Sequence, residues 1–287
     1  MATSPSVVAV TGATGFIGRQ LCTQLLQSGW SVRALVRNPK AAVALSQIGV
    51  ELIPGDLENR KALTRLLSGC DAVVHSAGAV RGANQADFDR TNVTGTSELI
   101  AATKRHAPEA RFIMLSSMAA LEPQLSWYAY SKFKAEQLLV RNAGSLEWAA
   151  LRPAAVYGPG DKEMLPIFRL MARGITPVPG ETDNRLSLLH VDDLVRAILV
   201  LLDVETAPCQ AMDICDGCEK GYSWDEITLL AEDVWHRRIR ILKLPKGLTN
   251  LVARINLRLA WLFNYAPMLT PPKLRELRHP NWVINNR

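Results

Sequence analysis

The first half of the chain alternates two patterns of apolar residues. Short runs rich in β-branched residues predict strands at 7–11, 31–36, 50–53, 71–76, 111–116 and 146–151. Between these runs, apolar residues recur at helical spacing and predict helices at 16–28, 40–48, 59–68, 87–106 and 128–142. Parallel strands need a crossover between them, so this strict alternation predicts a parallel sheet with helices on both faces.

The regular alternation ends after Pro153. Loops that contain prolines then alternate with short helices, a helix is predicted at 190–202, and a late strand at 212–215. We therefore expect a sheet domain at 1–159, to which 186–216 returns. The rest, 160–287, is expected to form a smaller and mostly helical lobe, with 160–185 and 217–287 as its main parts.

The composition narrows the class of protein. With 48% apolar and 21% charged residues, the 287-residue chain is typical of a globular protein. The net charge is +6, but no Lys/Arg run is interleaved with aromatic residues, so we expect no nucleic-acid partner. No apolar run reaches the roughly 18 residues that a transmembrane helix needs, and the polar segment Met1–Ser6 lacks the basic start of a signal peptide. We expect a cytoplasmic protein.

The five cysteines are scattered along the chain. Cys215 and Cys218 have a spacing seen in metal sites, and Cys209 is nearby, but no fourth ligand follows at a suitable distance. We expect neither a disulfide framework nor a metal site.

Residues 11–18 read Thr-Gly-Ala-Thr-Gly-Phe-Ile-Gly and lie between the first predicted strand and the first predicted helix. In this context Gly12 permits a tight turn, Gly15 a close approach of the backbone to a pyrophosphate, and Gly18 close packing of the helix on the strand. The helix start adds free N–H groups and the positive end of its dipole. We therefore predict an α/β fold with a Rossmann-type doubly wound parallel sheet that binds a nicotinamide dinucleotide. The predicted contacts in this loop are Thr11, Gly12, Thr14, Gly15, Phe16, Ile17 and Gly18.

The end of the second predicted strand indicates which dinucleotide is bound. A site that prefers NAD usually carries an acidic residue here to hold both ribose hydroxyls. This chain has Val36 and Arg37 instead, and a guanidinium pairs well with a 2′-phosphate. Arg19 or Arg33 could assist. We expect NADP as the cofactor, with NAD as the alternative.

Candidate catalytic residues follow the fifth predicted strand. Tyr128 and Lys132 are four positions apart on a predicted helix, so both reach one ligand. A nearby ammonium lowers the pKa of a phenol and makes it a usable acid or base. Ser117, just after the strand, is placed to bind the substrate oxygen. Tyr130 and Lys134 have the same spacing, so spacing alone does not choose between the two pairs.

Together these motifs resemble the short-chain dehydrogenase/reductase superfamily in its extended, epimerase/dehydratase-like branch. The resemblance covers nearly the whole chain. It includes the segments 11–18, 55–57, 75–78, 92–96, 128–136, 151–160 and 185–194. The segment 128–136 fits the pattern YxxSKxxAE, which selects Tyr128 and Lys132 over Tyr130 and Lys134.

The resemblance also implies further site residues. The implied cofactor contacts, besides the glycine loop and Arg37, are Asp56, Leu57, Ser76, Ala77, Gly78, Asn92, Ser116, Tyr128, Lys132, Pro153 and Val156. The implied contacts to a small-molecule substrate are Arg81, Ser117, Met118, Tyr157 and Arg185. Arg185 resembles an arginine that contacts a substrate phosphate in nucleotide-sugar members, and a surface salt bridge is its alternative role.

The residues after Ser117 bear on the type of reaction. Sugar dehydratases of this family carry an Asp-Glu pair there, whereas this chain has Met118 and Ala119. We therefore expect NADP-dependent interconversion of a secondary alcohol and a ketone. A lipophilic or steroid-like substrate is favoured, as in 3β-hydroxysteroid dehydrogenase-like members. The alternatives are a nucleotide-sugar epimerase or reductase and a non-catalytic NADP-binding subunit.

A second apolar pattern lies near the C-terminus. Seven large apolar residues recur at helical spacing, with Arg254 and Arg258 between them: Leu248, Leu251, Val252, Ile255, Leu259, Leu262 and Phe263. Three interpretations stay open: a helix packed on its own lobe, a lid over a lipophilic substrate, or a peripheral contact with a membrane surface. The resemblance further implies a monomer, or a homodimer formed through helices 87–106 and 128–142.

Overall fold

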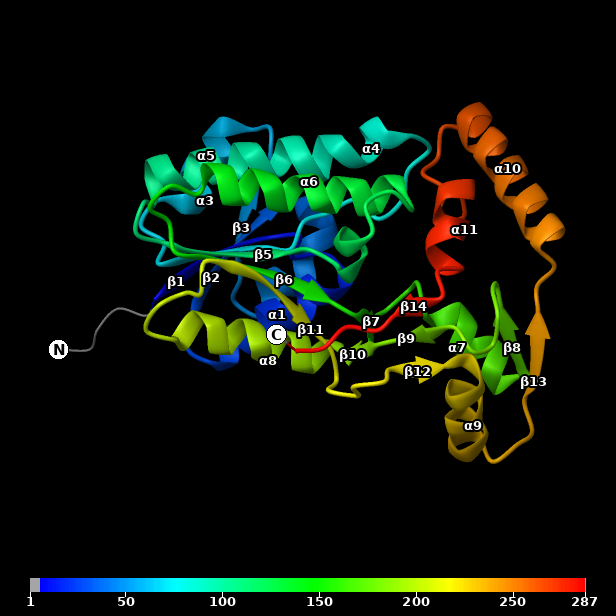
Figure 1. The fold of residues 1–287 in the computed structure, drawn as a ribbon. Helices are drawn as coiled ribbons and strands as arrows, with labels where there is room; N and C mark the ends of the chain where they lie inside the picture. Colours follow the sequence, from blue (N-terminus) through cyan, green and yellow to red (C-terminus); the bar gives the residue numbers. More distant parts are fainter. Residues whose placement is uncertain (1–5, 287) are drawn as a thin grey trace.

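The computed structural model describes residues 6–286. The prediction that Met1–Ser6 is not a signal peptide therefore falls on residues outside the described part, apart from Ser6. A seven-stranded sheet organises the chain, in the order β11-β6-β5-β4-β1-β2-β3 (Figure 1). Each neighbouring pair of strands is parallel. The strands are β1 (Val7–Thr11), β2 (Ser31–Val36), β3 (Glu51–Pro54), β4 (Ala72–His75), β5 (Arg111–Leu115), β6 (Trp148–Pro153) and β11 (Gln210–Ile214).

Helices cover both faces of this sheet (Figure 1). One face packs against α1 (Phe16–Gln27), α2 (Val43–Gln47) and α8 (Val191–Asp203). The other face packs against α3 (Arg60–Leu67), α5 (Thr96–His106) and α6 (Trp127–Asn142). Strands that are buried on both faces of a sheet consist mainly of apolar residues. This explains why apolar and polar residues do not alternate along β1 and β4. The predicted doubly wound sheet is confirmed.

Two predicted helices differ from the structure in detail. The helix expected at 40–48 is a 3₁₀ turn, η1 (Pro39–Ala42), followed by the short α2. The helix expected at 87–106 begins earlier, with α4 (Gln85–Asp89), and continues through a π-helical stretch, η2 (Arg90–Gly95), into α5. The earlier start has a local cause, because Asn84 and Asp87 form a reciprocal capping box.

The smaller lobe contains four helices together with several short strands that its sequence did not predict. Its helices are α7 (Leu165–Ala172), α9 (Trp224–Trp235), α10 (Lys246–Phe263) and α11 (Pro271–Leu277). Its strands are β8 (Ile175–Val178), β9 (Arg185–Leu186), β12 (Tyr222–Ser223), β13 (Arg240–Lys243) and β14 (Asn281–Trp282). They form the small sheets β13-β8 and β12-β9-β14, whose strands come from distant parts of the chain. Local pattern could not reveal such pairings.

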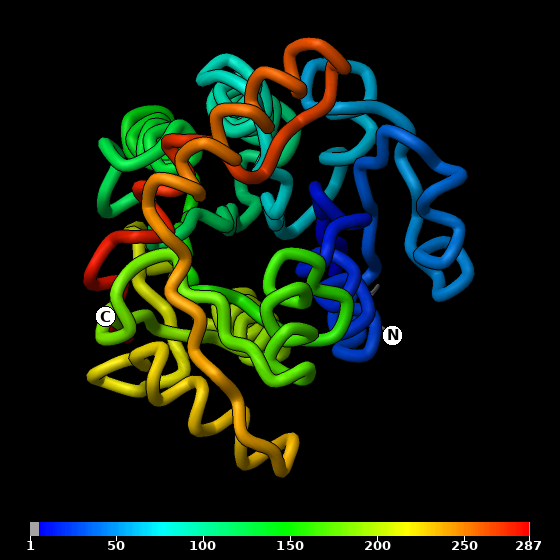
Figure 2. Tube along the Cα trace, turned by 90° about the vertical axis from the view of Figure 1, so that its right-hand side faces the viewer, coloured from blue at the N-terminus to red at the C-terminus, as the bar shows by residue number. Residues whose placement is uncertain are grey.

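The lobe lies at the carboxyl ends of the central strands (Figure 1). A parallel pair, β7 (Ala155–Tyr157) and β10 (Leu188–His190), joins it to the sheet domain. Seen from this end, α10 lies nearest the viewer (Figure 2). Within residues 6–286, no helix combines the length and the apolar character needed to cross a membrane.

Candidate active site

The glycine loop between β1 and α1 uses its glycines in two ways. Gly12 has φ of +75°, and a Cβ there would lie 2.6 Å from the backbone nitrogen of Ala77. A Cβ on Gly18 would lie 2.2 Å from the carbonyl oxygen of Gly12. A Cβ on Gly15 would meet only that oxygen, at 3.1 Å, and otherwise open space. Backbone packing therefore requires Gly12 and Gly18, whereas Gly15 keeps the space above the loop clear.

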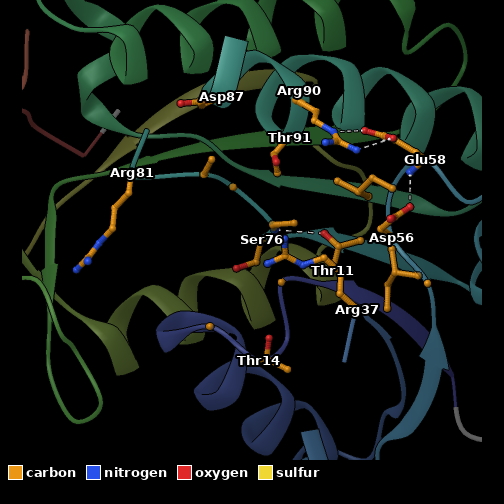
Figure 3. A pocket seen from close by; sticks show the side chains of 18 of the residues that line it. Thr11, Thr14, Arg37, Asp56, Glu58, Ser76, Arg81, Asp87, Arg90 and Thr91 are labelled. Atoms are coloured by element: carbon orange, nitrogen blue, oxygen red, sulfur yellow. Dashed lines mark hydrogen bonds and ion pairs between the residues drawn. The ribbon is translucent and has the colours of Figure 1, made fainter. Parts of the chain in front are cut away.

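A pocket of about 610 Å³ opens above this loop (Figure 3). The volume falls within the roughly 300–1,000 Å³ that small-molecule and cofactor sites occupy. The lining residues come from the loops after β1 to β4, from 87–91 and from the turn after α10. They include the predicted residues Thr11, Gly12, Thr14, Gly15, Arg37, Asp56, Leu57, Ser76, Ala77, Gly78 and Arg81.

The start of α1 suits an anionic ligand in this pocket. The helix begins at Phe16, followed by Ile17, and no side chain caps its first turn. Its first N–H groups and the positive end of its dipole are therefore available to a phosphate. With the space above Gly15, this arrangement fits a dinucleotide whose pyrophosphate lies over the loop.

One end of the pocket is lined by charged side chains. Arg37 reaches into it from the end of β2, with Asp56 nearby (Figure 3), and Leu57 also lines the pocket. Asp56 accepts a hydrogen bond from the backbone nitrogen of Glu58 at 3.0 Å, and Glu58 pairs with Arg90 at 2.6 Å. Because Arg90 is already neutralised by Glu58, Arg37 is the more available cation for a 2′-phosphate.

The two arginines that could assist Arg37 have other partners. Arg33 pairs with Glu51 on the neighbouring strand at 3.1 Å. Arg19 donates from Nε to the carbonyl oxygen of Thr14 at 3.0 Å. Neither lines the pocket, so of these three arginines only Arg37 is placed to contact a ligand there.

A buried histidine, His75, links three elements beside the pocket by hydrogen bonds, and the sequence did not indicate this role. His75 Nδ1 lies 2.7 Å from the Thr11 hydroxyl, and its Nε2 lies 2.9 Å from the Thr96 hydroxyl. Burial lowers the pKa of His75 to about 3, helped by the charge of Lys132. The imidazole is therefore neutral and links β1, β4 and α5.

The side chain of Asn92, an implied cofactor contact, forms its hydrogen bonds within the protein. Its Oδ1 accepts from the Ala79 nitrogen at 2.7 Å, and its Nδ2 donates to the Ala79 oxygen at 3.0 Å and to the Ser131 hydroxyl at 2.8 Å. It is buried and does not line the pocket. Asn92 thus holds the segment after β4 against α6.

Tyr128 is the second residue of α6, whose start is capped by the Ser126 hydroxyl. The expected lowering of the Tyr128 pKa by a nearby ammonium is not found: burial raises this pKa to about 12, while a hydrogen bond with Ser117 opposes the rise and the charge of Glu276 adds to it. The phenol is therefore protonated at neutral pH, which suits a proton donor beside Ser117.

Lys132 lies behind the pocket wall formed by Gly78. Its Nζ donates to the carbonyl oxygen of Leu115 at 2.8 Å. A Cβ on the pocket residue Gly78 would lie 3.1 Å from the same Nζ. Burial lowers the pKa of Lys132 to about 8, and the charge of Glu136 opposes this. The pocket thus leads from the glycine loop to the lysine of the candidate catalytic pair.

The competing pair lies on a different face of α6. Tyr130 is exposed, and Lys134 forms an ion pair with Asp89 and lies 4.7 Å from the centre of the Tyr130 ring. A surface cation–π pair of this kind explains Tyr130 and Lys134 without a catalytic role.

Ser116 does not point into the pocket. Its hydroxyl donates to Glu136, which also pairs with Arg152 at 2.6 Å. Arg152 lies 3.5 Å from Asp213 on the edge strand β11. This cluster, in which Glu136 is buried and Arg152 and Asp213 are partly buried, joins β5, α6, β6 and β11, and sequence spacing gave no sign of it.

The implied substrate residues are not all brought together. Arg81 lines the pocket and pairs with Glu163 at 2.8 Å. Tyr157 packs edge-on against Phe168 and His190, and Met118 packs against the core.

Arg185 is held by the lobe itself. Its guanidinium pairs with Glu226 at 2.8 Å and donates to the carbonyl oxygens of Lys220 and Gly221. Its second expected role, a salt bridge, is the one that the structure shows. Pro153 ends β6 and is buried, while Val156 lies in β7 against the core.

Helix α11 packs beside Tyr128, which the sequence did not indicate. Glu276 accepts a hydrogen bond from the Ser126 hydroxyl at 2.6 Å and pairs with Lys273. Lys273 Nζ lies 5.3 Å from the centre of the Tyr128 ring. A segment nearly 150 residues later in the chain therefore helps to bury the candidate proton donor.

The fold and the site together define an NAD(P)-dependent enzyme of the Rossmann type. Residues 8–215 match the family model described as the NAD dependent epimerase/dehydratase family. The ceramide reductase of Caulobacter vibrioides is 37% identical over 281 residues, 96% of this chain and 86% of the relative. The 2-alkyl-3-oxoalkanoate reductase of Shewanella oneidensis is 30% identical over 81% of this chain and 65% of its own length.

The comparison with solved structures agrees. The structure of MoeE5 in complex with UDP-glucuronic acid and NAD has a TM-score of 0.69 and 28% identity, covering 83% of this chain and 85% of the other. The chain belongs to the NAD dependent epimerase/dehydratase family, within the extended short-chain dehydrogenases/reductases. The resemblance inferred from the motifs is confirmed.

Proposed function

We propose that the protein is an NADP-dependent ketoreductase that acts on a lipophilic ketone. The observation that carries this proposal is the protonated Tyr128, hydrogen-bonded to Ser117, in a chain whose dinucleotide pocket contains Arg37. The names of the two relatives, a ceramide reductase and a 2-alkyl-3-oxoalkanoate reductase, support reduction of a substrate with an alkyl chain.

The chemistry follows from the protonation states. In the reduction direction Tyr128 donates its phenolic proton to the carbonyl oxygen, which Ser117 orients by a hydrogen bond. Protonated Lys132 stabilises the phenolate that remains until solvent returns the proton. When bound, NADPH supplies the hydride that the carbonyl carbon receives. The products are a secondary alcohol and NADP⁺.

A nucleotide-sugar epimerase or reductase is the second candidate, because MoeE5 was solved with a nucleotide sugar. Two observations weigh against it. Met118 and Ala119 follow Ser117 where a dehydratase carries acids, and Arg185 is engaged by Glu226. A non-catalytic NADP-binding subunit would not need Tyr128 and Lys132.

A substrate panel separates these functions. We expect the protein to oxidise NADPH with long-chain 2-alkyl-3-oxoalkanoates and other ketones with alkyl chains, and to leave UDP-glucuronic acid unchanged. NADPH absorbance and product chromatography measure both. Turnover of the nucleotide sugar without ketone reduction would overturn the proposal, and no turnover of any compound would favour a binding subunit.

Replacing Arg37 tests the NADP preference. We expect Arg37→Ala to raise the dissociation constant of NADPH by about 10- to 100-fold, because it removes a charge-assisted contact to the 2′-phosphate. NADH affinity should change by less than about twofold, since NADH lacks that phosphate. Fluorescence titration measures both, and Arg196→Ala, at an exposed site on α8, is the matched control. Equal losses for the two cofactors would contradict the assignment.

The rate of reduction should fall in alkaline solution. Tyr128, with a pKa of about 12, stays protonated, whereas Lys132, with a pKa of about 8, loses its charge as the pH rises through 8. We expect kcat to drop by up to about tenfold for each pH unit above 8. Lys132→Arg stays charged, so its residual activity should not show this drop. A wild-type profile that is flat to pH 10 would disprove the role of Lys132.

Three further expectations belong to the same proposal. We propose that residues 1–159 and 186–216 bind the cofactor, while 160–185 and 217–287 bind the substrate. A cytoplasmic location and a monomeric or homodimeric state are also proposed, on the sequence arguments given above.

A further inference from the structure

Helix α10 exposes its large apolar residues and buries its small ones. Ala253 and Ala260 are at most 2% exposed. With about 3.6 residues per turn, these alanines share one side of the helix. The opposite side carries Leu248, Leu251, Ile255, Leu259 and Leu262, all of them exposed. A helix that only packed on its own lobe would have the reverse arrangement, so the first of the three interpretations left open by the sequence does not account for this face.

The exposure is greatest at the C-terminal end of α10. Trp261, Leu262 and Phe263 are 73%, 74% and 68% exposed, and Tyr265 follows them. In Figure 1 the helix forms the outer edge of the molecule, and in Figure 2 it lies in front of the other elements. Large exposed aromatic and leucine side chains on one helix are typical of helices that lie in a membrane interface.

The charges around α10 are of one sign. No aspartate or glutamate occurs between Asp233 and Glu276, whereas this stretch contains nine lysines and arginines. The nine exceed the net charge of +6 for the whole chain, so positive charge is concentrated here. Arg254 and Arg258 flank the apolar face, are exposed, and form no ion pair within residues 6–286.

The positive charge around α10 favours an anionic lipid surface over a second copy of the chain as the partner of the apolar face. In a twofold contact between two copies of the chain, the arginines of both copies would come close together and repel. An anionic lipid surface instead neutralises them while the leucine and aromatic side chains enter the interface.

The apolar face also lies close to the pocket. Ala266, three residues after α10 ends, lines the pocket, and the carbonyl oxygen of Pro267 accepts a hydrogen bond from the nitrogen of Gly82 at 3.2 Å. The most exposed aromatic residues are thus only a few residues away from a wall of the site. A lipid surface bound at α10 would therefore lie beside the pocket.

We propose that α10 docks the protein onto the surface of an anionic phospholipid bilayer, with the face Leu248–Phe263 in the interface and Arg254 and Arg258 at the lipid phosphates. This inference goes beyond the proposed ketoreductase activity and does not depend on it, because docking is measured without substrate.

Flotation of the full-length protein with vesicles tests the docking. We expect binding to vesicles of phosphatidylcholine mixed with phosphatidylglycerol, and weaker binding to phosphatidylcholine alone or at high salt. The triple variant W261S/L262S/F263S should bind the mixed vesicles at least about tenfold more weakly. The double variant R254Q/R258Q should lose about tenfold on mixed vesicles and little on neutral ones.

The matched control removes exposed apolar residues elsewhere. Ile48, Val140 and Val200 are exposed on other elements, so I48S/V140S/V200S should bind vesicles like the wild type. Circular dichroism and NADPH titration would check that each variant keeps its fold. Wild-type protein that does not float with mixed vesicles would overturn the proposal, as would equal binding of the W261S/L262S/F263S variant. A dimer that this variant converts to a monomer, without lipid binding, would assign the face to a second copy instead.

Discussion

Replacing Tyr128 by phenylalanine is expected to lower the rate of ketone reduction by about 10²- to 10⁴-fold, the contribution typical of general acid catalysis. In the proposed mechanism the phenol is the proton donor, and burial keeps it protonated at neutral pH with a pKa of about 12. Phenylalanine keeps the ring and its packing against Phe88 but cannot donate a proton. The measurement is steady-state turnover of an active ketone from the substrate panel, together with fluorescence titration of NADPH.

Binding of NADPH should change by less than about twofold in this variant, because Tyr128 does not line the dinucleotide pocket. The matched control is Tyr130→Phe, which removes a hydroxyl from the exposed tyrosine two positions away. Its turnover should equal that of the wild type. If Tyr130→Phe lost activity and Tyr128→Phe kept it, the other tyrosine–lysine pair would be the catalytic one.

Adding a methyl group at Gly15 should weaken NADPH binding by about 100-fold or more, since a displacement of about 1 Å at a reacting or binding group is costly. The new Cβ would lie 3.1 Å from the Gly12 oxygen and otherwise occupy the space above the loop. The φ of Gly15 is −75°, which alanine adopts readily. We therefore expect Gly15→Ala to fold with a melting temperature close to that of the wild type.

Two comparisons make this result specific. Gly247→Ala places a methyl group on α10 where nothing lies within 4 Å, so it should leave NADPH binding unchanged and should not lower the stability of the fold. Gly12→Ala or Gly18→Ala would bring a Cβ into backbone atoms at 2.6 or 2.2 Å, so each should also destabilise the fold. Unchanged NADPH affinity in Gly15→Ala would show that the cofactor does not pass over this loop.

Much of the dinucleotide pocket could be predicted from sequence because its residues follow the ends of parallel strands. The carboxyl ends of parallel strands meet at one edge of the sheet, so Gly12, Arg37 and Asp56 come together wherever the fold forms. The same logic does not determine where the side chains of Ser116 and Asn92 point. Each residue lies in a segment that the resemblance includes. The Ser116 hydroxyl, however, donates to Glu136, and the Asn92 side chain accepts from the backbone nitrogen of Ala79.

The direction in which a side chain points depends on partners far away in the sequence. Glu136 accepts a hydrogen bond from Ser116 and forms an ion pair with Arg152. Glu276 accepts a hydrogen bond from the Ser126 hydroxyl. Neither contact has a local signature, because each forms only when separate elements pack. The small sheets of the lobe, in which β9 pairs with β12 and β14, have the same origin.

The sequence by itself determined the fold class, the glycine loop and the family, because these depend on local periodicity and on glycines that the backbone requires. It also identified the apolar positions of α10. Only the tertiary structure decided that Ala253 and Ala260 face inward and the leucines outward, since an amphipathic pattern does not state which face meets the protein. It likewise decided how deeply Tyr128 and Lys132 are buried, and their pKa values follow from that burial, which is supplied by residues distant in the chain.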